Sequence, residues 1–533
     1  MLLRHLLKSR FDQARELRAA GPDVPSNELL GDLDWIRQQK GAGQPNKKVV
    51  ILGAGIAGLS CAYELGRIGY KVVVLEAEPE HVGGRVRTHR CEASDGRELH
   101  AELGAMRIPV SHRLTRRYVD EFGLGTRPFV MSNPESMVHV RKHAFRLKDL
   151  QANEALAMNR FSLTAEEREL GYEGMWKRAV LDVLGGLSEE QIRELYAKTL
   201  TDEGVIELDH KGLSAALQDA DLSRDAREYV MTMIGLETAL PIALTEHLRE
   251  EHEEVWIGDF LELVGGTGRL AGAFHDALGD KVRQGCAVHR IEQSAGNDEA
   301  GPKATAYYRD PQGVERSETG DWIICTIPLG VLNRIDIQGA FDDAHLRAIQ
   351  GVNYDPSSKV IGRVPYRWWE KEQGIYGGGS MFDTQMGSTW YPSDNAPRGG
   401  AAPDPTVTDS ESLFLASYTW GQLARRIAAV PDQELDCTMV RELGRVHPAV
   451  AKDPGLYASE IRWCWDQVPT QAGAYAFFLP GEQFRFYQDL VEPDGCICLA
   501  GEHVSHTHSW IQGAIESAIV AMRHIVTATG KVQ

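Results

Sequence analysis

Six residues early in the chain have the types and spacing that bind a dinucleotide phosphate. They are Gly53-Ala54-Gly55-Ile56-Ala57-Gly58, which follow an apolar run and open a segment of helical spacing. The first glycine permits a tight turn, the second lets backbone approach a pyrophosphate, and the third allows close packing of the helix. Glu76 ends the next apolar run, where an acid binds a ribose hydroxyl. We therefore expect a dinucleotide site rather than an incidental glycine turn, and this motif alone fits NAD as well as FAD.

Two further segments add groups that bind anions. Gly83-Gly84-Arg85-Val86-Arg87-Thr88 offers backbone N–H groups and a forked arginine donor for a phosphate. Glu102-Leu103-Gly104-Ala105-Met106-Arg107 ends on an arginine whose planar guanidinium can hold a carboxylate by two parallel hydrogen bonds. The alternative for Arg107 is an ordinary salt bridge to an acidic side chain.

These motifs resemble those of the flavin-containing amine-oxidase superfamily, and among its members the L-amino-acid oxidases. The spacing E-x6-GGR-x-R-T from Glu76 resembles the second fingerprint of the superfamily, and 102–109 resembles the segment that passes the isoalloxazine ring. Segments 354–360, 390–392 and 500–514 are similar to later parts of the same family. The resemblance covers roughly 48–110, 259–392 and 460–525.

The resemblance implies roles for the residues near the substrate. Arg107 is expected to bind the substrate α-carboxylate, and Tyr391 to give it a second hydrogen bond, with Trp390 as the rival for that role. Lys359 is expected to hold a water near flavin N5, and its alternative is a solvated strand end.

Two neighbouring residues are expected to shape the pocket. Trp510 is expected to be an aromatic wall, and Ser509, where the family often has glycine, is expected to narrow it. The helix beginning near Ile511 is expected to point its positive end at the flavin.

The implied cofactor is FAD, held without a covalent bond. Trp465 is expected beside the ring, although an ordinary core tryptophan explains it nearly as well. The residues expected to contact FAD lie in these motifs, in the similar segments 288–291 and 325–328, and at Trp465. They are Gly53, Gly55, Ile56, Ala57, Gly58, Glu76, Ala77, Gly83, Gly84, Arg85, Gly104, Ala105, Met106, Arg107, Val288, Thr326, Trp465, Gly501, Glu502, Trp510, Ile511 and Ala514.

The implied activity is oxidative deamination of L-amino acids to 2-oxo acids, with dioxygen as acceptor and release of ammonia and hydrogen peroxide. An apolar or aromatic substrate is expected if Trp510 and its neighbours line the pocket. The alternatives are an amine or polyamine oxidase, an L-tryptophan-specific oxidase of secondary metabolism, and a non-catalytic flavin-bound scaffold.

The positioning elements predict an α/β fold. Apolar runs at 48–52, 71–75, 322–327 and 497–501 suit buried parallel strands, and 150–250 is helical, with capping-box signals at Thr164 and Ser188. The resemblance implies an FAD-binding Rossmann-like (GR2-type) domain, a mixed-sheet substrate domain and a helical domain. The expected boundaries are 1–46 for an N-terminal helical extension, 47–110, 255–335 and 485–533 for the FAD domain, 111–130 and 336–484 for the substrate domain, and 131–254 for the helical domain.

Composition excludes several other classes. With 57 Lys and Arg against 76 Asp and Glu, the net charge of −19 disfavours nucleic acid as a partner. We expect no membrane segment, a cytoplasmic location and a homo-oligomer, most simply a dimer. His503, His506 and His508 lie close together, but no carboxylate or cysteine cluster completes a ligand set, so no metal is expected.

Overall fold

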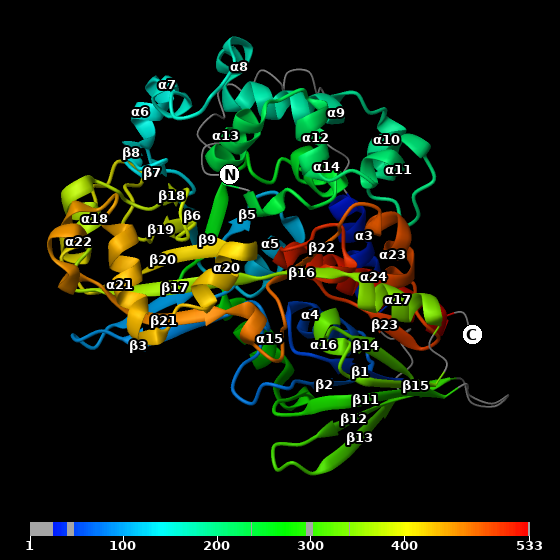
Figure 1. The fold of residues 1–533 in the computed structure, drawn as a ribbon. Coiled ribbons are helices and arrows are strands. Elements are labelled where there is room, and N and C mark those ends of the chain that lie inside the picture. Colours follow the sequence, from blue (N-terminus) through cyan, green and yellow to red (C-terminus); the bar gives the residue numbers. More distant parts are fainter. Residues whose placement is uncertain (1–24, 40–46, 236, 295–301, 340–341, 531–533) are drawn as a thin grey trace.

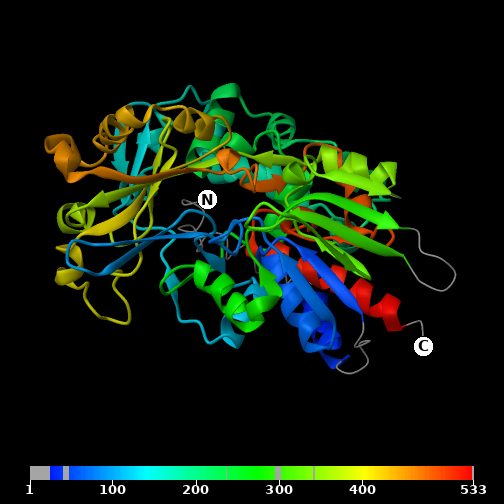
Figure 2. The ribbon, with the colours of Figure 1, turned by 90° about the horizontal axis from the view of Figure 1, so that it is seen from below.

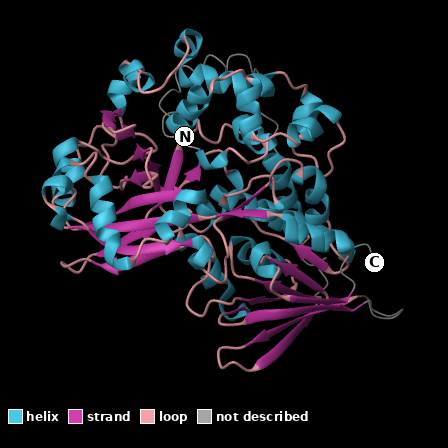
Figure 3. Cartoon of the chain, in the orientation of Figure 1, coloured by secondary structure: helices cyan, strands magenta, loops and turns pink. Residues whose placement is uncertain are grey.

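The computed structural model describes residues 25–39, 47–235, 237–294, 302–339 and 342–530. Three regions meet at the middle of the molecule: a parallel sheet with its helices, a mixed sheet, and a set of helices that covers one side of both (Figure 1). Figure 3 shows the same division by secondary structure. The chain passes between these regions several times, so each region is assembled from separate segments.

The parallel sheet has the strand order β10-β2-β1-β14-β23. Its core strands are short apolar runs rich in valine and isoleucine, as expected for strands that are buried on both faces. The bounds are β1 Lys48–Leu52, β2 Lys71–Leu75, β10 Val282–Arg283, β14 Trp322–Cys325 and β23 Ile497–Leu499.

Helices cover one face of this sheet and a second sheet covers the other (Figure 2). α4 (Ile56–Arg67) and α24 (Ile511–Gly530) pack on the first face with the valines and isoleucines of β1 and β2. On the second face lies the sheet β13-β12-β11-β15, with bounds β11 Ala287–Ser294, β12 Lys303–Arg309, β13 Glu315–Gly320 and β15 Asp336–Gly339. This arrangement is the α/β fold predicted from the sequence.

The mixed sheet has the order β21-β17-β20-β19-β18-β7-β8 and is antiparallel except between β18 and β7. Lys359 on β17 pairs with Tyr418 on β20, which places both residues near the middle of the sheet. The bounds are β7 Met137–Val140, β8 His143–Arg146, β17 Ser357–Val364, β18 Gly379–Phe382, β19 Ser388–Trp390, β20 Ser412–Trp420 and β21 Ala458–Cys464.

The third region is helical, and its buried apolar side chains, which include Trp176, Tyr229 and Leu248, form one core together with side chains of the mixed sheet. Thr164 and Ser188 form the predicted capping boxes. The bounds are α6 Leu147–Ala152, α7 Ala155–Met158, α8 Ala165–Trp176, α9 Asp182–Gly185, α10 Glu189–Glu194, α11 Glu203–Asp209, α12 Leu213–Asp219, α13 Arg224–Ile234 and α14 Leu244–His252.

Smaller elements connect these regions. The short sheets are β3-β4, β16-β22 and β5-β9-β6. Their bounds are β3 Thr88–Glu92, β4 Glu98–Glu102, β5 Ile108–Pro109, β6 Thr126–Phe129, β9 Phe260–Leu263, β16 Asn353–Asp355 and β22 Tyr475–Phe477. The remaining helices are α5 Arg113–Glu121, α15 Gly268–Leu278, α16 Leu329–Leu332, α17 Asp343–Gly351, α18 Trp368–Gln373, α19 Pro405–Thr408, α20 Gly421–Ala428, α21 Asp432–Leu443, α22 Pro448–Lys452 and α23 Glu482–Val491.

Part of the predicted N-terminal extension is described. α3 (Pro25–Gln38) buries Leu33 and Ile36 against the helices of the parallel sheet, whereas 1–24 and 40–46 lie outside the described residues. Among the residues described, no helix combines the length and the apolarity needed to cross a bilayer. The domain boundaries stay a prediction.

Candidate active site

A cavity of about 470 Å³ lies where the three regions meet, and residues of all three line it. Its wall contains every predicted site residue except Gly58, Tyr391 and the rival of Tyr391, Trp390. Segments as distant in the chain as 53–57, 246–250 and 509–514 contribute to it. The structure therefore brings the separate sequence motifs to one place.

The glycine turn after β1 makes one end of the cavity. Gly53 has φ +100°, a conformation that L side chains rarely adopt. A Cβ on Gly58 would lie 2.1 Å from the carbonyl oxygen of Gly53, so Gly58 serves close packing, which explains why it does not line the cavity. A Cβ on Gly55 would meet nothing within 4 Å, and no side chain caps α4 there. The free N–H groups of α4 and the open space beside Gly55 fit a bound phosphate.

Glu76 stands at the end of β2 beside this turn. Its carboxylate accepts hydrogen bonds from the backbone N–H of Ala54 at 2.6 Å and of Glu78 at 2.8 Å. The side chain is buried, and burial raises the pKa of Glu76. These bonds hold the carboxylate at the cavity wall, where it can accept a hydrogen bond from a ribose hydroxyl.

The second glycine motif is locked to the C-terminal motif by a buried ion pair. Nη1 of Arg85 lies 2.5 Å from Oε1 of Glu502, and Glu502 also accepts from the backbone N–H of Ala476 and Ser509. The indole N–H of Trp465 donates to the carbonyl of Leu103 at 3.0 Å, which fixes its ring in the wall. These contacts join segments that lie more than 300 residues apart in the chain.

These residues fit a flavin dinucleotide. The glycine turn and the end of α4 suit the pyrophosphate, and Glu76 suits a ribose. Beyond them the wall continues past Gly104 and Trp465 to α24, whose first residue Ile511 lies in the wall. A helix N-terminus carries partial positive charge, which favours an anion such as a flavin ring that has gained electrons.

Arg107 lies at the end of the cavity away from the glycine turn, and its charge has few hydrogen-bond partners. It is 9 % exposed, and its Nε and Nη1 find no hydrogen-bond partner among the residues described. Aromatic rings surround the guanidinium, with Cζ 5.1 Å from the ring centre of Trp390 and 5.3 Å from that of Trp256. Burial lowers the pKa of Arg107 to about 10, so it remains positively charged near neutral pH. A buried guanidinium with open donors suits an anionic ligand.

Tyr391 is not at the cavity, contrary to the prediction. Its hydroxyl shares hydrogen bonds of 2.8 Å with Ser380 and His447, and its ring packs 5.6 Å from that of Trp369. Successive side chains of an extended segment point to opposite faces. Trp390, the rival, faces Arg107, whereas Tyr391 faces the core of the mixed sheet.

Tyr418, which was not predicted, occupies the wall near Arg107. Burial raises the pKa of its hydroxyl, and the positive charge of Arg107 opposes that shift. Lys359, its partner across β17 and β20, lies with Nζ 4.5 Å from the Tyr418 ring. The register between β17 and β20 brings these two residues together. The sequence of one strand does not specify its register with another strand.

Lys359 is a buried residue of the wall rather than a solvated strand end. Its Nζ donates to the carbonyls of Glu102 at 3.1 Å and Gly104 at 2.6 Å. Burial lowers the pKa of Lys359 to about 7, because the low-dielectric surroundings disfavour the ammonium form. Lys359 therefore fixes the backbone of the segment that carries Arg107.

The helical region supplies a wall that the sequence did not predict. α14 places Glu246, His247 and Glu250 at the cavity, and Trp256 follows. The indole N–H of Trp256 donates to Oε2 of Glu250 at 2.9 Å. An i, i+4 pair of acids on a helix is common on surfaces, so the sequence alone did not distinguish this one.

The segment before α24 completes the wall. The Trp510 ring lies 5.3 Å from that of Trp256 and 5.0 Å from that of His112. Ser509 has φ +68°, a left-handed conformation that glycine adopts at less cost. This conformation agrees with the glycine that the resemblance to the family led us to expect at this position.

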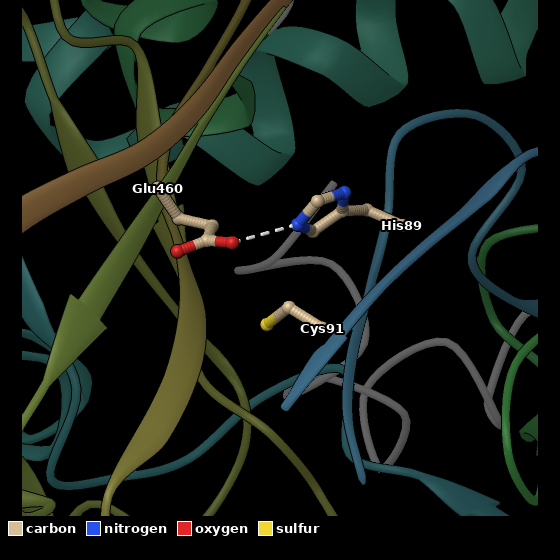
Figure 4. A group of neighbouring side chains, drawn as sticks. All are labelled: His89, Cys91 and Glu460. Atoms are coloured by element: carbon tan, nitrogen blue, oxygen red, sulfur yellow. Dashed lines mark hydrogen bonds and ion pairs between the residues drawn. The ribbon is translucent and has the colours of Figure 1, made fainter. Parts of the chain in front are cut away.

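A separate group of side chains, of types that can bind a metal ion, lies away from this cavity. His89, Cys91 and Glu460 come together, with Nε2 of His89 2.9 Å from Oε1 of Glu460 (Figure 4). The guanidinium of Arg363 already donates hydrogen bonds to two of these three side chains, at 3.0 Å to Cys91 Sγ and 2.7 Å to Glu460 Oε2. Because Arg363 supplies the positive charge, we assign no ion here.

Comparison with known proteins gives the class. The profile of flavin containing amine oxidoreductases matches residues 56–526. Flavin-dependent L-tryptophan oxidase RebO of Lentzea aerocolonigenes is 30% identical over 91% of this chain and 99% of its own. The L-amino-acid oxidase of Vipera ammodytes ammodytes is 28% identical over 91% and 93%, and the putative L-amino-acid oxidase YobN of Bacillus subtilis (strain 168) is 28% identical over 92% and 98%.

Solved structures agree on the fold. Cyclohexylamine oxidase from Brevibacterium oxydans IH-35A superposes with a TM-score of 0.68 at 20% identity, over 91% of this chain and 99% of its own. A putrescine oxidase bound to putrescine gives 0.68 at 17% identity, over 90% and 99%. The chain belongs to the flavin containing amine oxidoreductases. It is a flavoprotein oxidoreductase that acts on amines.

Proposed function

We propose that this protein is an FAD-dependent L-amino-acid oxidase. It converts an L-amino acid, dioxygen and water into a 2-oxo acid, ammonia and hydrogen peroxide. The observation that carries this proposal is Arg107, a buried guanidinium with open donors in the cavity wall. An amino acid brings the carboxylate that such a group requires, and the names of the similar L-amino-acid oxidases support the same reaction.

The residues of the chain have distinct roles in this proposal. Bound FAD would accept the hydride from the substrate α-carbon and pass the electrons to dioxygen. Arg107 holds the carboxylate, and the hydroxyl of Tyr418 replaces Tyr391 as the second donor. Lys359 holds the backbone beneath the substrate and a water beside it, and Trp510 shapes the pocket. Fixing the substrate at two points orients its α-hydrogen, which makes the transfer effectively intramolecular.

Non-covalent binding of FAD is supported by the position of cysteine in the cavity. Of the cysteines described, Cys286 alone lines the cavity, and its backbone N–H donates to the carbonyl of Glu76 at the nucleotide end. Acid precipitation should therefore release all the yellow colour into the supernatant. Colour that stays with the precipitated protein would contradict non-covalent binding.

The open guanidinium of Arg107 also disfavours an amine or polyamine oxidase. A cationic amine without a carboxylate would enter next to the positive charge of Arg107 and leave its donors open, at an electrostatic cost. An L-tryptophan-specific oxidase would be the same kind of enzyme with one substrate. A non-catalytic flavin-bound scaffold would have no oxidase activity at all.

Anaerobic mixing with each of the twenty L-amino acids separates these functions. Loss of yellow colour with L-amino acids, but not with amines that lack a carboxylate, is expected. Bleaching by amines alone indicates an amine oxidase, and no bleaching by any compound indicates a scaffold.

A further inference from the structure

We infer that Glu250 selects L-amino acids with a cationic side chain, which deepens and rests on the proposed oxidase function. Arginine and lysine are the natural members of this class. The inference departs from the expected apolar or aromatic substrate, because the helical region adds a carboxylate to the cavity wall, where it accepts a hydrogen bond from Trp256.

The first step is the placement of the two carboxylates. Glu246 and Glu250 are four residues apart on α14, so they lie on one face of the helix, and both line the cavity. Glu246 already has close partners inside the protein, since its Oε1 is 3.0 Å from Nδ1 of His508 and 3.0 Å from Nη2 of Arg249. Burial opposes ionisation of Glu246, but these partners outweigh it and lower the pKa to about 2. Glu246 is thus an internal structural anion.

The second step concerns the surroundings of Glu250. Its Oε2 accepts the indole N–H of Trp256, and the ring of that tryptophan lies 5.3 Å from Cζ of Arg107. The indole therefore connects the carboxylate to the guanidinium. The negative charge of Glu250 also acts to raise the pKa of Arg107, in opposition to burial. The two opposite charges belong to one substrate chamber.

The third step is the match between this chamber and a ligand. Arg107 offers a buried guanidinium with open donors to a carboxylate, and Glu250 offers a carboxylate to a cation. Trp256 and Trp510 line the same cavity, and aromatic rings attract a guanidinium or ammonium group. An amino acid with a cationic side chain places one charge at each site. The ligand and the wall are then complementary in sign at both ends.

The fourth step is discrimination against other amino acids. An apolar side chain would displace water from Glu250 without supplying positive charge, which costs free energy in a low-dielectric cavity. A diamine would match Glu250 but would oppose Arg107. Specificity therefore comes from repulsion of the wrong ligands as well as from attraction of the right one.

The kinetic test compares substrates that differ only in charge. L-citrulline replaces the guanidinium of L-arginine by a neutral urea, and L-norleucine lacks the ammonium of L-lysine. We expect kcat/KM for L-arginine to exceed that for L-citrulline on the order of 100-fold. In Glu250→Gln the value for L-arginine should fall by about 100-fold, whereas the value for L-citrulline should change by less than about threefold.

A neighbouring carboxylate provides the matched control. Glu251 is buried on the same helix and accepts from the indole N–H of Trp176, but it does not line the cavity. Glu251→Gln should leave the ratio of L-arginine to L-citrulline unchanged. An equal loss of that ratio in both variants would overturn the assignment of Glu250.

A binding measurement keeps the inference testable if Glu250→Gln folds poorly or turns over too slowly. 5-Guanidinopentanoate has the carboxylate and the guanidinium but no α-amine, so it cannot be oxidised. It should perturb the flavin spectrum of the wild-type protein at concentrations about 100-fold lower than pentanoate. Equal affinity for the two acids would overturn the inference.

The outcomes also separate this inference from the proposed function. If L-norleucine and L-citrulline are oxidised as well as L-lysine and L-arginine, the inference fails and the oxidase remains. If no L-amino acid bleaches the protein, the proposed function itself fails. If agmatine, which is arginine without its carboxylate, reacts as well as L-arginine, the role of Arg107 fails while that of Glu250 stands.

Discussion

The two ends of the cavity are built on different principles. At the nucleotide end, Glu76, Arg85 and Glu502 all have internal partners that hold them in place before a ligand arrives. At the substrate end, Arg107 is buried among aromatic rings with two nitrogen atoms left open. The polar side chains at the Glu76 end are thus satisfied within the protein, whereas the open donors of Arg107 are those that the proposed substrate would engage. An unpartnered buried charge that also lines a cavity is a candidate contact for a second molecule.

The largest expected effect is at Arg107. Arg107→Met should lower kcat/KM for L-amino acids on the order of 1000-fold, because the paired hydrogen bonds to the carboxylate are lost. The flavin content should stay the same. Thermal unfolding should occur at equal or higher temperature, because an open buried charge has been removed.

Arg107→Lys is the control for charge without the forked geometry, and it should recover only part of the loss. Steady-state kinetics and the ratio of absorbance at 450 and 280 nm give both readouts. Wild-type kinetics in Arg107→Met would show that the substrate end does not need this ligand contact.

The next largest effect is at the nucleotide end. Glu76→Ala removes a carboxylate that accepts two backbone hydrogen bonds, so FAD affinity should fall on the order of 100-fold. Titration of the apoprotein with FAD, followed by fluorescence quenching, measures this. Glu80→Ala, an exposed carboxylate nearby, is the control and should bind as wild type. Full retention of FAD in Glu76→Ala would remove the ribose assignment.

A smaller effect is expected at Lys359, between the two ends. Lys359→Met should slow the reaction with dioxygen about tenfold while changing substrate affinity less. The wild-type rate should change around pH 7, where Lys359 titrates, and the variant should lose that inflection. Stopped-flow reoxidation across pH 5.5–9 (about the range in which a shifted lysine titrates) provides the test, and an unchanged profile would contradict it.

The same lowered pKa fixes the sign of the stability effect. Between about pH 7 and its ordinary value of 10.5, the unfolded chain holds a proton that the folded lysine lacks. The contribution of Lys359 to the free energy of unfolding therefore rises with pH across that window. The stability gained in Lys359→Met should accordingly be largest below pH 7.

The smallest effect tests the backbone beside Trp510. Ser509→Gly relieves a left-handed conformation and should stabilise the protein by about 1 kcal/mol. Asp221, with φ +54° and outside the cavity, is the matched site, and Asp221→Gly should stabilise the protein similarly. Only the change at Ser509 is expected to alter KM. Thermal melts and KM values distinguish a purely conformational effect from a widened pocket.

The sequence was enough to group the residues at the Glu76 end of the cavity, because that end depends on local motifs. Gly53, Gly55 and Glu76 act within one β-α-β unit, so their spacing is enough to place them. The substrate end depends on strand register and on packing between regions. Tyr391 was chosen by local resemblance and lies on the wrong face, whereas Tyr418 reaches the cavity through its pairing with Lys359.

Glu250 and Trp256 were missed for a related reason. Helical periodicity shows that α14 is amphipathic, but it does not show which region of the protein the polar face meets. That face becomes part of the site only because the helical region packs against the other two regions at the cavity.

The order of strands in the parallel sheet also has a consequence for biosynthesis. β23 and α24 follow β1 by more than 400 positions, yet β14 and β23 pair directly beside it and Ile511 closes the same cavity. A nascent chain that has exposed only the glycine turn has only part of the expected binding site. We therefore expect the flavin to be retained only after residues 497–514 have left the ribosome, which makes cofactor loading a late step in maturation.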